Sequence, residues 1–367
     1  MSLPFIDLKS QFVALESEVR ARIDRVFDHG QYIMGPEVAE LEQKLSQFTG
    51  AKYCVTVSSG TEALLISLMA LGVGPGDEII TTPFTFVATA EVIVLLGAKP
   101  VFVDVEPDTC NICVAKIEEK ITQNTKAIIP VSLYGQPADM DEINEIAARY
   151  GDIPVIEDAA QSFGATYKGL KSCNLSKIGC TSFFPSKPLG CYGDGGAVFT
   201  SDPALADACR QIRVHGQSER YVHTRVGVGG RMDTIQCAIV LAKLSRFEWE
   251  IQKRIELGEM YNRLLDGIGV DRVAQKSDRT SVFAQYTVFL NSREEVREKL
   301  SVSGVPTAVH YPVPLNEQPA YSKHCCPECT PVASSLSRRV MSLPMSPDLS
   351  PEDLKRVVGS LKEAGCA

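Results

Sequence analysis

The sequence has little of several features that mark common functional classes. Its 367 residues contain no run of lysine or arginine, and the formal net charge is -8, so we do not expect a nucleic-acid-binding surface. The longest apolar region, 87–105, is interrupted by charged residues, glycine and proline, which excludes a membrane-spanning helix there. The first residues lack a basic stretch followed by an apolar core, so we expect no secretory signal and a cytoplasmic protein.

Cysteine is not scarce, but its spacing lacks the pattern of a disulfide framework. Twelve cysteines are scattered along the chain, which fits a reducing compartment. One cluster, from His324 to Cys329, contains a Cys-x-x-Cys pair. A structural zinc site needs a second pair, and none follows at the usual spacing. We therefore predict an exposed loop there and no metal.

What the sequence does contain is an alternation of short apolar segments and helical segments. Apolar runs typical of buried strands lie at 53–57, 78–82, 99–104, 126–131, 154–158, 178–184 and 196–200. Helical periodicity is found at 10–28, 38–48, 60–71, 84–96, 114–123, 139–149, 233–266 and 351–364. Short apolar strands separated by helices predict an α/β fold with a mostly parallel seven-stranded sheet, covered on both faces.

The pattern changes in the last third of the chain. Strand patterns at 281–290 and 306–309 follow a long helical stretch and precede the final helix. We expect a large domain over 1–245, with an N-terminal helical segment, and a smaller C-terminal α+β domain over 246–367.

A lysine between two prolines is the first candidate for chemistry. Lys187 lies in the stretch Ser182-Phe183-Phe184-Pro185-Ser186-Lys187-Pro188-Leu189-Gly190. Proline and glycine disfavour a helix interior, so we expect a loop. Apolar neighbours would lower the pKa of the amine, which suits a lysine that attacks a carbonyl group. The alternative is an ordinary surface lysine.

Two further features fall where ligands bind in parallel sheets, beyond the carboxyl ends of strands. The turn Ser58-Ser59-Gly60-Thr61-Glu62 begins a helix, where free amides favour a phosphate, although a plain helix cap is the alternative. No Gly-x-Gly-x-x-Gly follows a strand, so a single phosphate fits better than a dinucleotide. Asp158 ends an apolar strand, where a buried carboxylate needs a cation or donors unless it simply caps a helix.

Together these parts match what pyridoxal phosphate requires. The cofactor needs an amine for its aldehyde, an anion for its ring nitrogen, and donors for its phosphate. Phe84 and Phe86 are candidates for the aromatic face against its ring, with core packing as the alternative.

The chain resembles the DegT-type nucleotide-sugar aminotransferases, pyridoxal-phosphate-dependent enzymes with the aspartate aminotransferase fold (fold type I). The resemblance covers nearly the whole chain, through Phe5-Ile6-Asp7-Leu8, Gly35-Pro36-Glu37-Val38, Ser59-Gly60-Thr61 and His310-Tyr311-Pro312-Val313-Pro314-Leu315.

The resemblance implies roles for the candidate residues. Lys187 would hold the cofactor's aldehyde, and Asp158 would pair with the ring nitrogen. The other expected cofactor contacts are Gln161 at the phenolic oxygen, Phe86 on the ring, and Gly60, Thr61, Ser182 and the Glu62 backbone at the phosphate. Family members are homodimers, and the segment 226–233 would complete the partner's site. The family's asparagine in that segment is replaced by Gly229, so one phosphate contact should be missing.

Within the family, the chain is most similar to members that act on UDP-linked 3-keto sugars of the N-acetylglucosaminuronate type. The motifs are His29-Gly30-Gln31-Tyr32-Ile33, Ser182-Phe183-Phe184-Pro185-Ser186-Lys187 and Thr307-Ala308-Val309-His310-Tyr311. By this resemblance the sugar pocket would contain Gly30, Tyr32, Ser186, Arg231, His310 and Tyr311. The planar fork of Arg231 suits a carboxylate, although an interface salt bridge is the alternative. His310 could equally be a core histidine.

The expected reaction is a two-stage amino transfer. L-Glutamate would donate its amino group, with Lys187 moving the alpha proton, and C3 of UDP-2-acetamido-2-deoxy-3-oxo-D-glucuronate would accept it, for lipopolysaccharide O-antigen synthesis. The alternatives are a 4-keto acceptor, a sugar dehydratase with the same cofactor, and a non-catalytic sensor. Lys187 argues against the dehydratase, because those relatives lack the lysine.

Overall fold

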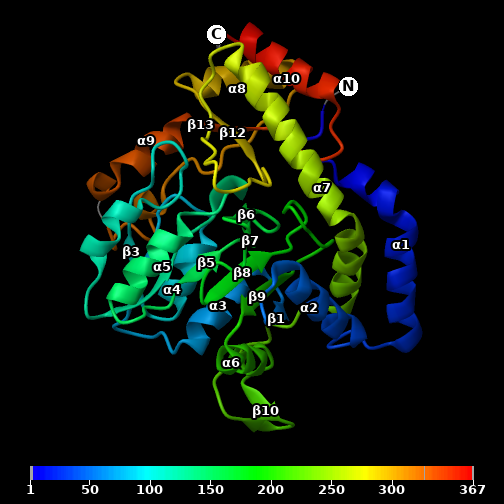
Figure 1. Ribbon diagram of the computed structural model, residues 1–367, viewed down its shortest axis with the longest axis vertical. Coiled ribbons are helices and arrows are strands. Elements are labelled where there is room, and N and C mark those ends of the chain that lie inside the picture. The colour runs from blue at the N-terminus through cyan, green and yellow to red at the C-terminus, as the bar shows by residue number, and fades with distance from the viewer. Residues whose placement is uncertain (1–2, 326, 366–367) are drawn as a thin grey trace.

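A seven-stranded sheet forms the centre of the computed structural model, which describes residues 3–325 and 327–365 (Figure 1). Its strands are β1 (Tyr53–Val57), β2 (Glu78–Thr81), β3 (Lys99–Phe102), β4 (Thr125–Ile129), β5 (Ile156–Asp158), β8 (Ile178–Ser182) and β9 (Gly196–Thr200). The groups β1-β9-β8-β5 and β3-β2-β4 are joined by parallel bridges, from Ile128 to Val155 and from Val131 to Asp158. The predicted α/β fold is confirmed.

Only β9 runs against its neighbours in this sheet. It pairs antiparallel with both β1 and β8, and its first residue, Gly196, lies opposite Val57 and Ser182, the last residues of those strands. The glycine run that precedes β9 therefore returns to the edge where β1 and β8 end.

Helices cover both faces of the sheet. They are α2 (Pro36–Thr49), α3 (Gly60–Ala70), α4 (Ala88–Leu95), α5 (Met140–Arg149), α6 (Pro203–Arg213) and α7 (Thr234–Asp266), and a further helix, α1 (Leu8–His29), packs on α7. Successive strand residues face opposite sides, so Cys54 and Phe199 pack in a cluster with residues of α2 and α7, whereas Val55 and Val198 pack with residues of α3 and α6.

Three helical segments differ from the sequence prediction. Helix α4 begins at Ala88 rather than at 84, because Phe84 to Val87 follow the strand as a turn. The segment 114–123 forms only two short 3₁₀ turns, Val114–Lys116 and Glu118–Lys120, because a segment this short gains few hydrogen bonds against the cost of nucleation. Helix α6 was not predicted.

The C-terminal part has its own apolar core. It contains β12 (Tyr286–Phe289), α8 (Arg293–Val302), α9 (Pro331–Arg339), β13 (Val340–Leu343) and α10 (Pro351–Glu363). Tyr261 and Leu265, near the end of α7, pack in this core with β12, β13 and α10. The strand predicted at 306–309 is reduced to a bridge from Ala308 to Ser342. Residue 245 lies inside α7, and a domain boundary there stays a prediction.

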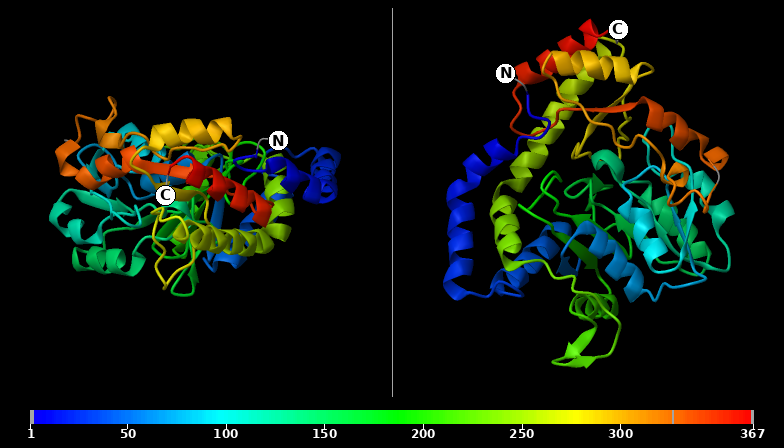
Figure 2. Two further views of the ribbon diagram at one scale, coloured as in Figure 1. Left: turned by 90° about the horizontal axis from the view of Figure 1, so that it is seen from above. Right: turned by 180° about the vertical axis from the view of Figure 1, so that it is seen from behind.

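A short arm projects from the body below α6 (Figure 1). It carries β10 (Gln217–Glu219) and β11 (Val222–His223), and Tyr221 at its turn is 79% exposed. A smaller hairpin pairs β6 (Thr166–Tyr167) with β7 (Leu170–Lys171). At the N-terminus, α1 packs along α7, as the rear view in Figure 2 shows.

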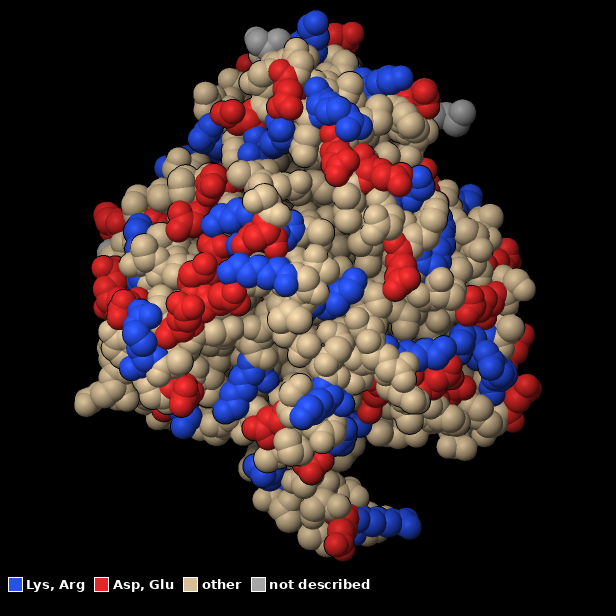
Figure 3. All heavy atoms as spheres, viewed as in Figure 1, with Lys and Arg blue, Asp and Glu red and all other residues tan. Residues whose placement is uncertain are grey.

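The surface is mixed in charge. Basic and acidic side chains are interspersed over the face shown in Figure 3. Among the described residues, no helix combines the length and the apolar character needed to cross a bilayer. Cys326, part of the cysteine cluster, lies outside the described residues.

Candidate active site

Three of the predicted site segments lie where strands end at one edge of the sheet. Strand β1 leads into the Ser58–Glu62 turn, β5 ends at Asp158, and β8 ends at Ser182. Asp158 and Cys180 are paired in the parallel register of β5 and β8, so the loop that carries Lys187 begins beside Asp158.

The loop that carries Lys187 is held by main-chain hydrogen bonds. Phe183 N donates to Gly195 O at 2.7 Å, Cys191 N donates to Phe183 O at 2.7 Å, and Lys187 N donates to Phe184 O at 2.9 Å. A Cβ atom at Gly190 would lie 2.6 Å from Phe184 O, so only glycine fits this turn. The loop predicted from proline and glycine is therefore present, and it is tightly folded.

Lys187 and Asp158 act on each other electrostatically. Burial lowers the pKa of the Lys187 amine, and the charge of Asp158 opposes this effect. Burial raises the pKa of Asp158, whereas donors from Ala160 N and Thr89 Oγ1 and the charge of Lys187 lower it. The two groups thus share one water-poor site, where the amine loses its proton more readily than in water.

The turn before α3 is arranged as an anion site. The Ser59 hydroxyl accepts a hydrogen bond from Glu62 N at 3.0 Å, whereas Gly60 and Thr61 in the first turn have no helical carbonyl for their amides. A Cβ atom at Gly60 would lie 2.7 Å from Ser182 Cβ. The missing side chain lets the turn approach Ser182, as the predicted phosphate contacts require. The Glu62 amide is already occupied by Ser59.

The Gln161 side chain is fixed in orientation by its partners. Gln161 Oε1 accepts from Tyr134 N at 2.9 Å, and Nε2 donates to Tyr311 Oη at 3.1 Å. Because a main-chain amide can only donate, the oxygen of Gln161 must face Tyr134.

Aromatic rings stand beside this amide. The centroid of the Tyr311 ring lies 6.3 Å from that of Phe86 and 6.5 Å from that of Phe84. Phe84 is buried, as its core alternative requires, whereas Phe86 is 51% exposed, so its predicted stacking role stays open.

The C-terminal part contributes His310 and Tyr311. The His310 Nδ1 atom lies 3.1 Å from Ser342 Oγ, and the His310 carbonyl accepts from the Tyr134 hydroxyl. Burial lowers the pKa of His310 to about 4, with the charge of Lys187 acting in the same direction. This histidine is therefore neutral near pH 7 and lies near the lysine.

A second group of predicted residues gathers around the start of α7. Gly30 ends α1 in the left-handed conformation, with φ at 67°. The carbonyl of Tyr32 accepts from Thr234 N at 3.0 Å, and Ile33 pairs with Asp233. The loop 30–34 therefore lies against the segment that follows Arg231. Ser186 belongs to the lysine loop and is half-buried.

Comparison with known proteins gives the family. The model of the DegT/DnrJ/EryC1/StrS aminotransferase family matches residues 13–362. The chain is 56% identical, over 98% of its length and 99% of the relative's, to UDP-2-acetamido-2-deoxy-3-oxo-D-glucuronate aminotransferase of Pseudomonas aeruginosa. The chain belongs to the DegT/DnrJ/EryC1/StrS aminotransferase family.

Solved structures agree with this assignment. A DegT DnrJ EryC1 StrS aminotransferase from Brucella abortus superposes with a TM-score of 0.94 at 40% identity, over 98% of this chain and 99% of that one. The NtdA protein of Bacillus subtilis, solved with bound cofactor PMP, superposes with a TM-score of 0.91 at 31% identity, over 99% and 85%. The predictions of fold type I, of aminotransferase activity and of pyridoxal phosphate are confirmed.

The residues of this DegT-family chain fit the cofactor. The Asp158 carboxylate is buried and suits a protonated ring nitrogen, and the Gly60 and Thr61 amides suit the phosphate. A side chain at Gly60 would fill the space beside Ser182. Lys187 would hold the aldehyde, which the burial of its amine favours. When bound, the cofactor supplies an electron sink for the carbon that loses its proton.

Sequence reasoning missed some residues of this site. Thr89 donates to Asp158 Oδ2 at 2.9 Å, and the amide of Tyr134 orients Gln161. Thr89 stands in the same short stretch as Phe86, where threonines recur, and that recurrence is the only signal the sequence offered.

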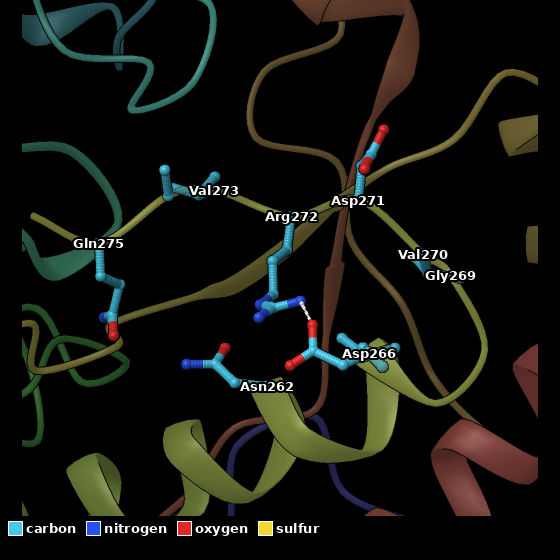
Figure 4. A pocket seen from close by; sticks show the side chains of 10 residues that line it. Asn262, Asp266, Gly269, Val270, Asp271, Arg272, Val273 and Gln275 are labelled. Carbon is cyan, nitrogen blue, oxygen red and sulfur yellow. Dashed lines mark hydrogen bonds and ion pairs between the residues drawn. The ribbon is translucent and has the colours of Figure 1, made fainter.

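A separate pocket of about 600 Å³ lies in the C-terminal part. It is bounded by the end of α7 and the segment 269–275, and Arg272 donates to Asp266 within it at 2.8 Å (Figure 4). None of its lining residues belongs to the predicted active site.

Proposed function

We propose that this enzyme transfers the amino group of L-glutamate to C3 of UDP-2-acetamido-2-deoxy-3-oxo-D-glucuronate, in the cytoplasm, for lipopolysaccharide O-antigen synthesis. The observation that supports an aminotransferase is the electrostatic interaction of the half-buried Lys187 with the buried Asp158 at one sheet edge. The choice of sugar is supported by the identity of 56% to the Pseudomonas aeruginosa enzyme that acts on it.

The residues of the chain have separate tasks in this reaction. The neutral amine of Lys187 takes the proton from the alpha carbon of glutamate, and in the second half it returns a proton to C3 of the sugar. Asp158 holds the positive charge of the cofactor's ring nitrogen through both halves. The phosphate turn holds the cofactor while donor and acceptor exchange.

Selection of a uronate sugar is assigned to Arg231, in the second group around α7. Its planar guanidinium can bind both oxygens of the sugar carboxylate. Tyr32 and Gly30 lie on the loop beside the segment that follows it, and His310 and Tyr311 approach from the C-terminal part. Ser186 precedes the lysine and completes the proposed sugar contacts.

The substrate assignment is tested with a panel of UDP-linked keto sugars. Purified enzyme with L-glutamate is incubated with the 3-keto glucuronate, the 3-keto sugar without the carboxylate, and a 4-keto sugar, and products are identified by mass spectrometry. We expect amination of the 3-keto glucuronate at the highest rate. Preferred amination of the 4-keto sugar would contradict the proposal.

The active unit is proposed to be a homodimer with shared sites. The arm projects from the body, and Val226 beside it is 84% exposed, so this segment is free to reach a second copy. Gly229 has no side chain to offer the partner's cofactor phosphate. A Cβ atom there would lie 3.2 Å from His215 Cε1, so the imidazole lines the space beside this glycine.

Sharing of sites is tested by mixing two inactive variants, Lys187→Ala and Arg231→Ala. If each site combines Arg231 of one chain with Lys187 of the other, a mixed dimer has one intact site. Because about half of the dimers are mixed, activity should rise to about a quarter of the wild type. If both residues serve the same site of one chain, mixing restores nothing.

A further inference from the structure

We propose that Thr89, supported by Thr85, is a positioning residue that keeps Asp158 ionised and aimed at the cofactor's ring nitrogen. Thr89 Oγ1 donates to Asp158 Oδ2 at 2.9 Å, and Thr85 Oγ1 lies 3.2 Å from Thr89 Oγ1. Both threonines are buried, with exposures of 0% and 2%.

The direction of this hydrogen-bond chain follows from the charge of Asp158. An ionised carboxylate only accepts hydrogen bonds, so the Thr89 proton points at Oδ2. The Thr89 oxygen then accepts the proton of Thr85. The other carboxylate oxygen, Oδ1, accepts from Ala160 N at 3.2 Å. Each oxygen of Asp158 thus has a protein donor and still keeps a lone pair for the ring nitrogen.

These donors oppose the effect of burial. Burial raises the pKa of Asp158, whereas the hydrogen bonds from Ala160 N and Thr89 and the charge of Lys187 lower it. Lys187 works as a neutral amine or bound to the cofactor, so its charge is not available throughout the reaction. Thr89 and Ala160 remain, and they favour the proton on the ring nitrogen rather than on the carboxyl group.

One segment of the chain combines two functions toward the ring. Thr85 precedes Phe86, whose exposed ring is expected to cover one face of the cofactor, and Thr89 lies in the first turn of α4. The stacking side chain and the support of Asp158 therefore share one backbone segment. A displacement of this segment would change both contacts together.

The first test compares two ligands rather than rates. Apoprotein of the wild type and of Thr89→Val is titrated with pyridoxal phosphate and with its 1-deaza analogue, in which a carbon replaces the ring nitrogen. We expect the variant to bind pyridoxal phosphate about tenfold more weakly and to bind the analogue as the wild type does. An equal loss for both ligands, or no loss for either, would overturn the proposal.

The second test reads the ring nitrogen directly. With ¹⁵N-labelled pyridoxal phosphate, the nitrogen signal of Thr89→Val should move toward that of neutral pyridine, and Thr89→Ser should restore it. Thr85→Val should shift the nitrogen signal less, in the same direction. This variant replaces Thr89→Val as the test if Thr89→Val does not fold. An unchanged signal in both valine variants overturns the proposal. Neither test involves a sugar. A negative result would therefore count against the role of Thr89 and not against the proposed sugar substrate.

Discussion

The cofactor half and the sugar half of the candidate site are built in different ways. Around Asp158 and Gln161, side chains are buried and hydrogen-bonded, to Thr89 and to the main-chain amide of Tyr134 respectively. Around Tyr32 and Arg231, side chains are half-buried or exposed, and the loop is held by backbone hydrogen bonds and by the Tyr32 ring, whose centroid lies 6.4 Å from that of Phe27. The cofactor half is therefore held by hydrogen bonds between buried groups, whereas the sugar half leaves its side chains more accessible.

Replacing Lys187 removes the group on which both halves depend. We expect Lys187→Ala to fold and to lose turnover by about 10³-fold, because its amine is the group proposed to move the proton. Turnover and thermal unfolding of the purified variant check this. Lys177→Ala, which changes an exposed lysine, is the matched control and should keep full turnover. Substantial activity in Lys187→Ala would remove the basis of the mechanism.

A change in the phosphate turn should affect only the cofactor half. Gly60→Ala places a Cβ atom 2.7 Å from Ser182 Cβ, and the turn must move away. We expect a loss of about 1–3 kcal/mol in binding of pyridoxal phosphate, measured by titration of the apoprotein. Gly74→Ala is the control, because a Cβ atom there meets nothing within 4 Å. Unchanged cofactor affinity in Gly60→Ala would show that the close approach is unimportant.

A change at Arg231 should affect only the sugar half. We expect Arg231→Lys to raise KM for the uronate sugar about tenfold, because an ammonium group cannot bind both carboxylate oxygens in one plane. The half-reaction with glutamate should be unchanged, as should KM for a keto sugar without the carboxylate. A slower glutamate half-reaction would place Arg231 in the cofactor half instead.

A change at His310, which lies near Lys187, should have the smallest effect. Its pKa of about 4 is below the ordinary value, so between pH 6.5 and 4 the unfolded chain binds a proton that the folded chain does not. Stability from this group is complete above pH 6.5 and falls as the pH drops toward 4. His310→Gln should therefore lose Tm less steeply than the wild type over this window. Parallel pH profiles of Tm would contradict the assigned pKa.

The sequence predicted the positions that local chemistry defines. Asp158 was found because a carboxylate ends an apolar strand, and the Lys187 loop was found because proline and glycine exclude a helix. Thr89 could not be found in this way, because its partner lies 69 residues away and the contact exists only after the sheet has formed. Tyr134 acts through its main-chain amide. Because nearly every residue has such an amide, the sequence could not predict this contact.

The same distinction applies to the fold. All seven central strands were predicted because buried strands are short apolar runs. Hydrophobic periodicity does not predict which strands pair or in which direction they run. It therefore could not show that β4 lies beside β5 or that β9 is antiparallel to its neighbours. Helix α6 was missed although Asp202 caps it and proline opens it, so the local signal was present.

Helix α7 fixes the orientation of the C-terminal core relative to the core under the sheet. Cys237 is fixed in the core under the sheet and Tyr261 in the C-terminal core, both on one uninterrupted helix of 33 residues. Inserting one residue between them would turn the far half by about 100°. Tyr261 would then leave its core, and the segment that carries His310 would lose its position near Lys187. The helix therefore tolerates substitution far better than any change of length.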